Sequence, residues 1–222
     1  MKHTFFIKDW LNSFLSLLFP HCCVVCGRPL AKGEECLCIM CNINLPRTNY
    51  HLRKDNPVER LFWGQIPLER ATSFFFYRKG SDFRQILHQL KYGGKKEVGI
   101  IMGRYMAAEL SDSGFFEGVD VIIPIPLHKK KQQIRGYNQS ECIARGIAAV
   151  TGITVCVESV VRRKNTETQT RKSVFERWEN VDGIFELNHA DSLTGKHILI
   201  VDDVLTTGAT TIACASRLAE VE

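Results

Sequence analysis

The feature that most constrains this 222-residue chain is an apolar run, ILIV, that is directly followed by two acidic residues, Asp202 and Asp203. A short loop then leads into a predicted helix over 209–218, and it contains Thr206, Thr207, Gly208, Ala209 and Thr210. Small residues in such a loop let successive backbone N–H groups surround a phosphate at the positive end of a helix. The two carboxylates can accept hydrogen bonds from adjacent hydroxyls, as on the diol of a ribose. The pattern therefore predicts a sugar-phosphate site at the carboxyl end of a buried strand.

The alternation of strands and helices along the chain predicts an α/β fold. Strands are expected at 71–77, 119–126, 155–161 and 197–203, and helices at 83–90, 98–110, 138–150 and 209–218. Because these strands are apolar throughout, we expect a parallel sheet with helices on both faces. Residues 47–70 are polar and predict a linker or a loose hood, and 163–180 predict a long charged segment. The glycine loop is neither a Walker A motif nor a G-x-G-x-x-G fingerprint.

The nine cysteines are distributed unevenly, since six of them lie between Cys22 and Cys41. Four form two C-x2-C pairs separated by eleven residues: Cys23, Cys26, Cys38 and Cys41. This spacing is typical of a zinc ribbon, in which four thiolates close a tetrahedral structural site. Two disulfides or free thiols are the alternative, and Cys22 or Cys36 could replace one of the four ligands. A metal site and an odd cysteine total favour a reducing compartment and thus a cytoplasmic protein, which partners could bring to a membrane.

The first twenty residues form a segment of their own. Apolar residues recur there at intervals of four and predict an amphipathic helix ended by Pro20; they are Phe6, Trp10, Phe14 and Leu18. No run approaches the ~18 apolar residues that span a bilayer, and a cleaved signal peptide is the minor alternative. We therefore predict three parts: this helix at 1–20, a four-cysteine zinc ribbon at 21–46 and the α/β domain at 47–222.

The formal net charge is +5, and the basic excess is concentrated in one part of the chain. Residues 128–178 contain eleven Lys or Arg and four acidic residues, on two segments that each follow a predicted strand. The basic residues nearest to these strands are Lys129, Lys130, Lys131, Arg162, Arg163 and Lys164. They are candidate contacts for a diphosphate or for a polyanion such as single-stranded DNA. A solvated loop is the alternative for Lys129–Lys131.

The stretch VDDVLTTGAT resembles the phosphoribosyl diphosphate (PRPP) signature of type I phosphoribosyltransferases. The cysteine pairs, LKYGG at 90–94 and IPIPLHKKKQQIRGYNQSE at 123–141 further resemble the ComF family, whose members pair a zinc knuckle with a phosphoribosyltransferase-like domain. The R-G-aromatic-N-Q stretch of that family is matched by Arg135, Gly136, Tyr137, Asn138 and Gln139. A later pattern of the family is matched by Thr166, Gln169, Arg177, Asn180 and Phe185.

The resemblance implies a type I phosphoribosyltransferase-like parallel sheet and a role for each matched residue. Asp202 and Asp203 would contact the ribose hydroxyls, and Thr206–Thr210 would hold the 5′-phosphate. Arg135 and Gly136 would belong to the loop that binds the diphosphate of PRPP and its Mg²⁺. Related sequences continue with a further strand and helix, so we expect this domain to lack its last strand, with consequences for folding or for a homodimer.

Two functions are compatible with these features. Many ComF proteins are linked to natural DNA uptake and transformation, which implies a PRPP-binding protein that engages single-stranded DNA or DNA-uptake proteins. The alternative is an active phosphoribosyltransferase that transfers phosphoribosyl from PRPP to a nucleobase or an amine. In that case Asp202 and Asp203 would hold the ribose during the reaction, mainly by positioning it.

Overall fold

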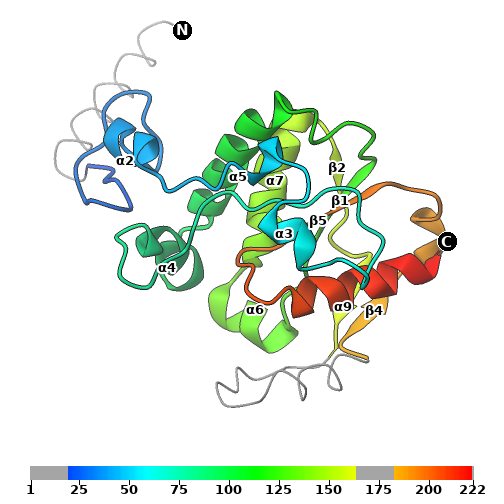
Figure 1. Ribbon diagram of the computed structural model, residues 1–222. Helices are drawn as coiled ribbons and strands as arrows, with labels where there is room; N and C mark the ends of the chain where they lie inside the picture. Colours follow the sequence, from blue (N-terminus) through cyan, green and yellow to red (C-terminus); the bar gives the residue numbers. More distant parts are fainter. Residues whose placement is uncertain (1–19, 164–182, 222) are drawn as a thin grey trace, which may run out of the picture. The chain divides into compact units, whose positions relative to one another are not determined.

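Figure 1 shows the chain as a computed structural model, and the structure describes residues 20–163 and 183–221. The chain divides into two compact units. We call Met1–Pro46 with Tyr77–Leu87 the cysteine unit, and Arg47–Phe76 with His88–Glu222 the sheet unit. The predicted amphipathic helix and Lys164 lie outside the described residues. The domain boundaries that we place after residues 20 and 46 stay predictions.

A three-stranded parallel sheet forms the centre of the sheet unit, as the sequence predicts. Its strands are β1 (Val121–Pro124), β2 (Thr154–Val155) and β5 (Ile198–Val201), in the order β2-β1-β5. Pro124 at the end of β1 lies beside Val201 at the end of β5. The loops that follow these two strands therefore leave the sheet at the same edge.

Helices cover both faces of this sheet (Figure 1). Successive residues of a strand face opposite sides, so Ile123 packs in the same cluster as α9 (Ala209–Leu218). Ile122 packs on the other side with α5 (Lys96–Ser111) and α7 (Gln139–Thr151). The predicted α/β architecture, with a parallel sheet between helices, is confirmed.

Glycines allow α5 and α7 to pack closely against each other. A Cβ atom at Gly146 of α7 would lie 2.0 Å from the carbonyl oxygen of Ile100. A Cβ at Gly103 of α5 would lie 2.2 Å from the carbonyl oxygen of Ile143. Because interiors are densely packed, a side chain at either position would force the helices apart. The contact thus fixes α7, whose first turn reaches the carboxyl edge of the sheet.

The strand predicted at 155–161 is wrong as a single element. β2 ends at its beginning, and a second strand, β3 (Val160–Arg162), pairs antiparallel with β4 (Phe185–Leu187). The chain between β2 and β3 turns outward, which leaves Val157 exposed. One predicted strand therefore supplies residues to two sheets, and the chain bends between them at the polar residues Glu158 and Ser159.

The strand predicted at 71–77 is also wrong. The structure has an isolated antiparallel bridge there, between Phe75 and Arg47, in place of a strand. Phe76 instead packs edge-on against Tyr50, with 5.7 Å between the ring centroids. Aromatic residues favour strands mainly through the packing that a sheet offers, and here ring contacts supply that packing without a sheet.

Residues 47–70, which we call the hood, are ordered, whereas the sequence predicts a linker or a loose hood. Asn56 begins α3 (Pro57–Arg60), and its side chain accepts hydrogen bonds from the backbone N–H groups of Val58 and Glu59. The Asn56 amide also donates to the carbonyl of Ala71 at 2.8 Å. A capping box of this kind holds a short helix that its length alone would not stabilise.

The basic loop predicted after β1 is a helix, α6 (Lys129–Arg135). His128 precedes it and accepts a hydrogen bond from the backbone N–H of Lys130, while Gly136 ends it with a φ of 81°. Glycine adopts this left-handed conformation at little cost, so the sequence does contain a helix end signal. The lysines predicted to lie on a loop are therefore presented by helical backbone.

The remaining helices are short, apart from α4. They are α2 (Ile39–Ile43), η1 (Tyr50–Leu52), α4 (Arg84–Tyr92), η2 (Ala190–Ser192) and η3 (Ala219–Val221).

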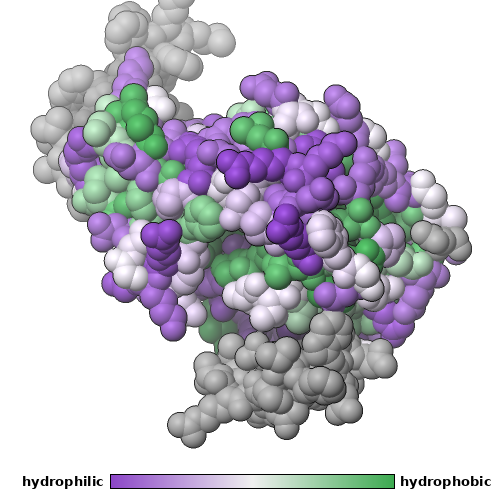
Figure 2. All heavy atoms as spheres, in the orientation of Figure 1, coloured by the Kyte–Doolittle hydropathy of each residue, from purple (hydrophilic) through white to green (hydrophobic). Residues whose placement is uncertain are grey.

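Among the described residues, no helix has both the length and the apolar character needed to cross a membrane. Hydrophilic residues predominate on the face drawn in Figure 2, and hydrophobic residues show between them.

Candidate functional site

Three segments that are distant in the sequence meet after β5. Ser140, in the first turn of α7, donates a hydrogen bond from Oγ to Oδ1 of Asp202 at 3.1 Å. The backbone N–H of Asp203 donates to the same oxygen at 2.8 Å. Lys91, in the last turn of α4, forms an ion pair with Asp203, with 3.0 Å between Nζ and Oδ2. We call these four residues the carboxylate site.

One acidic side chain of this site, Asp202, is held where ionisation is unfavourable. Burial raises the pKa of Asp202 to about 6, and the negative charge of Asp203 acts in the same direction. The hydrogen bonds from Asp203 and Ser140 and the positive charge of Lys91 lower this pKa, but do not restore its usual value. Perturbed carboxylates of this kind are typical of functional sites. A ligand that donates hydroxyl hydrogen bonds would stabilise the ionised form.

The loop after the carboxylates is anchored on the hood. Gly208 begins α9 with a φ of 76°, and a Cβ there would lie 3.0 Å from the ring of Phe62. Phe62 and Ile212 of α9 share a small apolar cluster. Thr206 and Thr207, by contrast, are exposed. Because packing against the hood fixes the backbone of this loop, the N–H groups in the first turn of α9 and the hydroxyls of Thr206 and Thr207 can face an anion.

The R-G-Y-N-Q stretch connects the end of α6 to the last turn of α4. The Tyr137 hydroxyl donates a hydrogen bond to the carbonyl of Leu90 at 2.7 Å. The guanidinium of Arg135 lies 5.7 Å from the ring centroid of Tyr92 and donates to Oε1 of Gln139 at 2.8 Å. The stretch therefore holds Arg135 beside the turn that carries the lysine of the carboxylate site.

Sequence reasoning did not assign a role to Lys91 or Ser140. Their pairing with the acids depends on how α4 and α7 pack, and no local pattern reports that packing. Both residues nevertheless lie within LKYGG and IPIPLHKKKQQIRGYNQSE, the stretches that resemble the ComF family. That likeness was the available signal.

The basic residues singled out in the sequence have different surroundings. Lys129 and Lys130 are exposed on α6. Arg163 is exposed and pairs with Glu186 across the β3–β4 hairpin. Arg162 is half-buried; burial lowers its pKa, and the charge of the Asp202 carboxylate opposes that shift. Contacts with a polyanion therefore stay a prediction, and in the part of the chain that the structure describes α6 presents exposed lysines for them.

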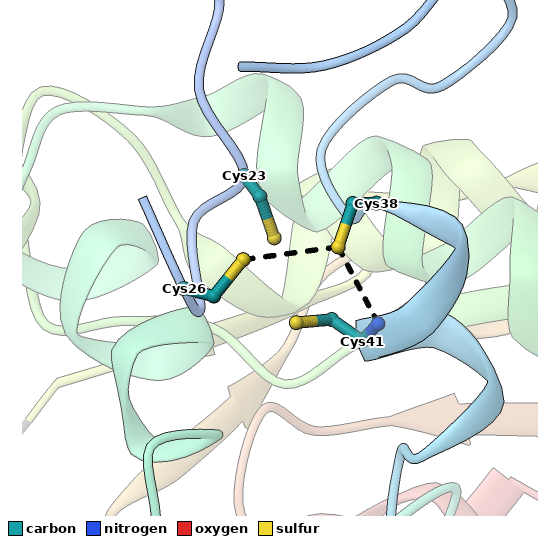
Figure 3. A group of neighbouring side chains, drawn as sticks. All are labelled: Cys23, Cys26, Cys38 and Cys41. Carbon is teal, nitrogen blue, oxygen red and sulfur yellow. Dashed lines mark hydrogen bonds between the residues drawn. The ribbon is translucent and has the colours of Figure 1, made fainter. Parts of the chain in front are cut away.

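The cysteines of the two C-x2-C pairs lie together in the cysteine unit (Figure 3). Their four sulfur atoms lie within 4.8 Å of one another, and the sulfurs of Cys26 and Cys38 are 3.7 Å apart. A tetrahedral site with Zn–S bonds of about 2.3 Å has sulfur–sulfur edges of about 3.8 Å, so the donor set fits zinc. The thiols are free and not joined as disulfides, and Cys22 and Cys36 lie outside the cluster.

Neighbouring donors favour a thiolate within this cluster. Nη2 of Arg28 donates a hydrogen bond to Sγ of Cys38 at 2.9 Å, and the backbone N–H of Cys41 donates to the same sulfur at 3.4 Å. Burial acts to raise the pKa of Cys38, but these hydrogen bonds lower it to about 6. Because the thiolate is the form that binds metal, the cluster could hold an ion such as zinc. Four sulfur ligands leave no open position, which suits a structural role.

Comparisons with known proteins relate the chain to one domain family and to several named proteins. Residues 136–222, which include α7, β5 and both acids, match the family described as phosphoribosyl transferase domain. Over 217 residues the chain is 29% identical to DNA utilization protein YhgH of Shigella flexneri, covering 91% of this chain and 92% of that protein. It is 26% identical over 213 residues to competence protein ComFC of Bacillus subtilis, covering 94% of this chain and 76% of that protein. The chain therefore resembles YhgH and ComFC over most of its length, as the sequence resemblance to the ComF family implies.

The likeness of this chain to its relatives is not confined to the phosphoribosyl transferase region. Alignments that cover 91% and 94% of the chain necessarily reach into the cysteine unit. A shorter match, 34% identical over 92 residues, relates 41% of the chain to 40% of competence protein F of Haemophilus influenzae. The family resemblance expected from the sequence is confirmed, together with its phosphoribosyltransferase-like fold.

Proposed function

We propose that this protein binds PRPP, together with the Mg²⁺ that PRPP carries, at the carboxylate site and the loop beside it. The observation that supports this most is the half-buried acid pair that ends β5 and leads through Gly208 into α9. Asp202 and Asp203 would accept hydrogen bonds from the ribose hydroxyls, and Thr206–Thr210 with the start of α9 would bind the 5′-phosphate. Arg135 and Gly136 would lie at the diphosphate.

Calorimetric titration of the full chain with Mg²⁺ and PRPP tests the proposal. Asp203→Asn removes a negative acceptor and should weaken binding about tenfold or more. Asp191→Asn, a change at an exposed acid of η2, is the matched control and should bind like the wild type. Absence of PRPP binding by the wild type, or unaltered affinity of Asp203→Asn, would contradict the site.

We also propose that the protein serves DNA uptake or utilisation; one relative is named a DNA utilization protein and another a competence protein. The exposed lysines of α6 are the candidate contacts for single-stranded DNA. Affinity for an oligonucleotide should then fall steeply as salt rises, because phosphate contacts release counterions. Exchanging Lys129 and Lys130 for Ala should reduce both the affinity and the salt dependence. Exchanging the exposed pair Lys95 and Lys96 is the control, and a flat salt response would refute direct DNA binding.

Phosphoribosyl transfer is the second candidate function, and the match of residues 136–222 to phosphoribosyl transferase domains favours it. In such a step the bond from C1 of the ribose to the diphosphate breaks, and a bond from C1 to the acceptor nitrogen forms. The acid pair would stabilise the positive charge that develops on the ribose. Release of diphosphate from PRPP, measured with a panel of nucleobases and amines, separates the alternatives. Acceptor-dependent release indicates an enzyme, whereas binding without release indicates a binding module.

We propose that the four clustered cysteines hold a structural zinc ion. The fit of their sulfur spacing and the lowered pKa of Cys38 support this. Zinc would join the chain around the two C-x2-C pairs and would supply no catalytic water, since all four positions are taken.

A further inference from the structure

Lys91 lies at the ribose contact of the proposed PRPP site, next in the chain to a residue that touches the proposed diphosphate contact. Its ammonium group is 3.0 Å from Oδ2 of Asp203, the proposed ribose contact. The next residue, Tyr92, lies beneath the guanidinium of Arg135, the proposed diphosphate contact. One turn of α4 therefore contacts both Asp203, which would bind the ribose, and Arg135, which would bind the diphosphate.

The backbone and the surroundings of Lys91 restrict where its side chain can go. The preceding residue, Leu90, is 1% exposed, and its carbonyl accepts the hydrogen bond from Tyr137. The side chains of Lys91 and Asp203 are only 23% and 14% exposed. Because a largely desolvated ammonium is costly without a partner, Lys91 requires an anion close to its present position.

Ribose binding would compete with Lys91 for the Asp203 carboxylate. A diol hydroxyl that donates to Oδ2 takes the place of the ammonium hydrogen bond, and Lys91 then loses its counter-ion. PRPP carries a new counter-ion, since its diphosphate begins at C1, next to the diol. Ribose 5-phosphate has the same diol and the same 5′-phosphate, but it lacks the diphosphate.

We propose that Lys91 exchanges partners when PRPP binds, from Asp203 in the free protein to the diphosphate in the complex. This inference rests on the proposed function of the carboxylate site. It makes Lys91 a specificity-determining residue. The diol of any such ligand breaks the ion pair of Lys91 with Asp203, but only a ligand with an anionic group at C1 gives Lys91 a new counter-ion. Ribose 5-phosphate breaks the same ion pair without replacing it and should bind less well.

The charge of Lys91 should also be visible in the pH dependence of binding. Asp202 is faced by the charged or titratable groups of Asp203, Lys91, Arg162 of β3 and Cys214 of α9. Among these, Lys91 lowers the pKa of Asp202. Its removal should raise that pKa above about 6, so the pH below which binding weakens should rise. Loss of packing alone would expose Asp202 to water and lower its pKa, which moves this midpoint in the opposite direction.

The test compares PRPP and ribose 5-phosphate on the full chain at pH 8, where Asp202 is ionised, with Lys91→Met as the variant. Methionine keeps the length of the side chain and removes the charge. Lys91→Met should weaken PRPP binding about 10- to 100-fold, the usual effect of losing a hydrogen bond to a charged group. It should leave ribose 5-phosphate binding equal or tighter, because a competitor for Asp203 is gone. Lys95→Met, an equivalent change at an exposed lysine, should alter neither.

The other outcomes overturn the inference in distinguishable ways. Equal losses for both ligands would mean that Lys91 only supports the shape of the site, and unaltered PRPP affinity would mean that it does not contact the diphosphate. Lys91→Arg keeps the charge and should keep the preference for PRPP, so loss of this preference in both variants would exclude a charge exchange. A wild-type chain that binds neither ligand would overturn the proposed function itself and Lys91 with it.

Discussion

The cysteine cluster and the carboxylate site gather ionisable groups in opposite ways. The cluster takes its four ligands from one short stretch, Cys23 to Cys41, and a neighbouring arginine favours the thiolate form that binds metal. The carboxylate site takes its residues from α4, α7 and the end of β5, and burial disfavours the charged form of Asp202. The first arrangement would gain stability from the zinc ion that we propose for it, whereas the second loses stability as long as no ligand stabilises its charge. Each can be broken without the other.

The largest expected effect is on the cluster. Cys38→Ser removes one thiolate while keeping a side chain that can cap α2, as Cys38 does. Because structural zinc supplies much of the folding free energy of small cysteine modules, we expect bound zinc to fall from about one ion per chain to nearly none. The stretch 20–46 should become sensitive to protease, as measured by limited digestion.

Cys22→Ser is the matched control for this change, because Cys22 is exposed and lies outside the cluster. It should keep the zinc. The PRPP binding that we propose for the sheet unit should survive in both variants. A Cys38→Ser protein with full zinc content would show that another residue completes the site.

The same contrast explains how much the sequence could predict. Grouping of the cysteines follows from spacing within a few residues, and β5, the glycine loop and α9 also form one continuous stretch. Both were therefore predictable. The ion pair of Lys91 with Asp203 and the hydrogen bond of Ser140 with Asp202 arise from packing of distant elements. No window of sequence contains both partners of either contact.

Errors in the predicted elements have the same origin. Aromatic residues at 71–77 have strand propensity, yet contacts such as that of Phe76 with Tyr50 hold them outside any sheet. The lysines after β1 read as a loop because of their charge, although His128 and Gly136 supply the helix ends. Local propensity was correct where it agreed with the tertiary packing and failed where that packing or a cap decided the outcome.

Breaking the long-range assembly should have the next largest effect. Gly146→Ala places a Cβ 2.0 Å from the carbonyl oxygen of Ile100, so α5 and α7 must separate. The gain in helix propensity from alanine is smaller than the strain, and we expect a loss of about 3 kcal/mol in the free energy of unfolding. Urea unfolding followed by circular dichroism measures it.

Gly80→Ala is the control, because a Cβ at Gly80 meets open space. Zinc content should remain that of the wild type in both variants, since the cysteine unit is compact by itself. An unaltered unfolding midpoint for Gly146→Ala would show that the helices tolerate separation and that they do not fix the carboxylate site.

The smallest effect should be a gain in stability at the carboxylate site itself. The pKa of Asp202 in the folded protein, about 6, lies above its usual value of 3.8. Protonated Asp202 therefore contributes fully to the stability of the folded protein below about pH 3.8. This contribution is lost as pH rises through about 6. Asp202→Asn keeps a neutral side chain at every pH, so its advantage over the wild type should grow between about pH 4 and pH 7, to about 1–3 kcal/mol.

Urea unfolding of both proteins at several pH values measures this difference, with Asp191→Asn as an exposed control that should show none. The stabilised variant should bind PRPP poorly, because the amide replaces an ionised acceptor of the ribose hydroxyls. A difference that does not change with pH would mean that Asp202 ionises freely in the folded protein. The charged form of Asp202 would then cost no stability, as the thiolate form of the cysteine cluster does not. The contrast between the two regions would be lost.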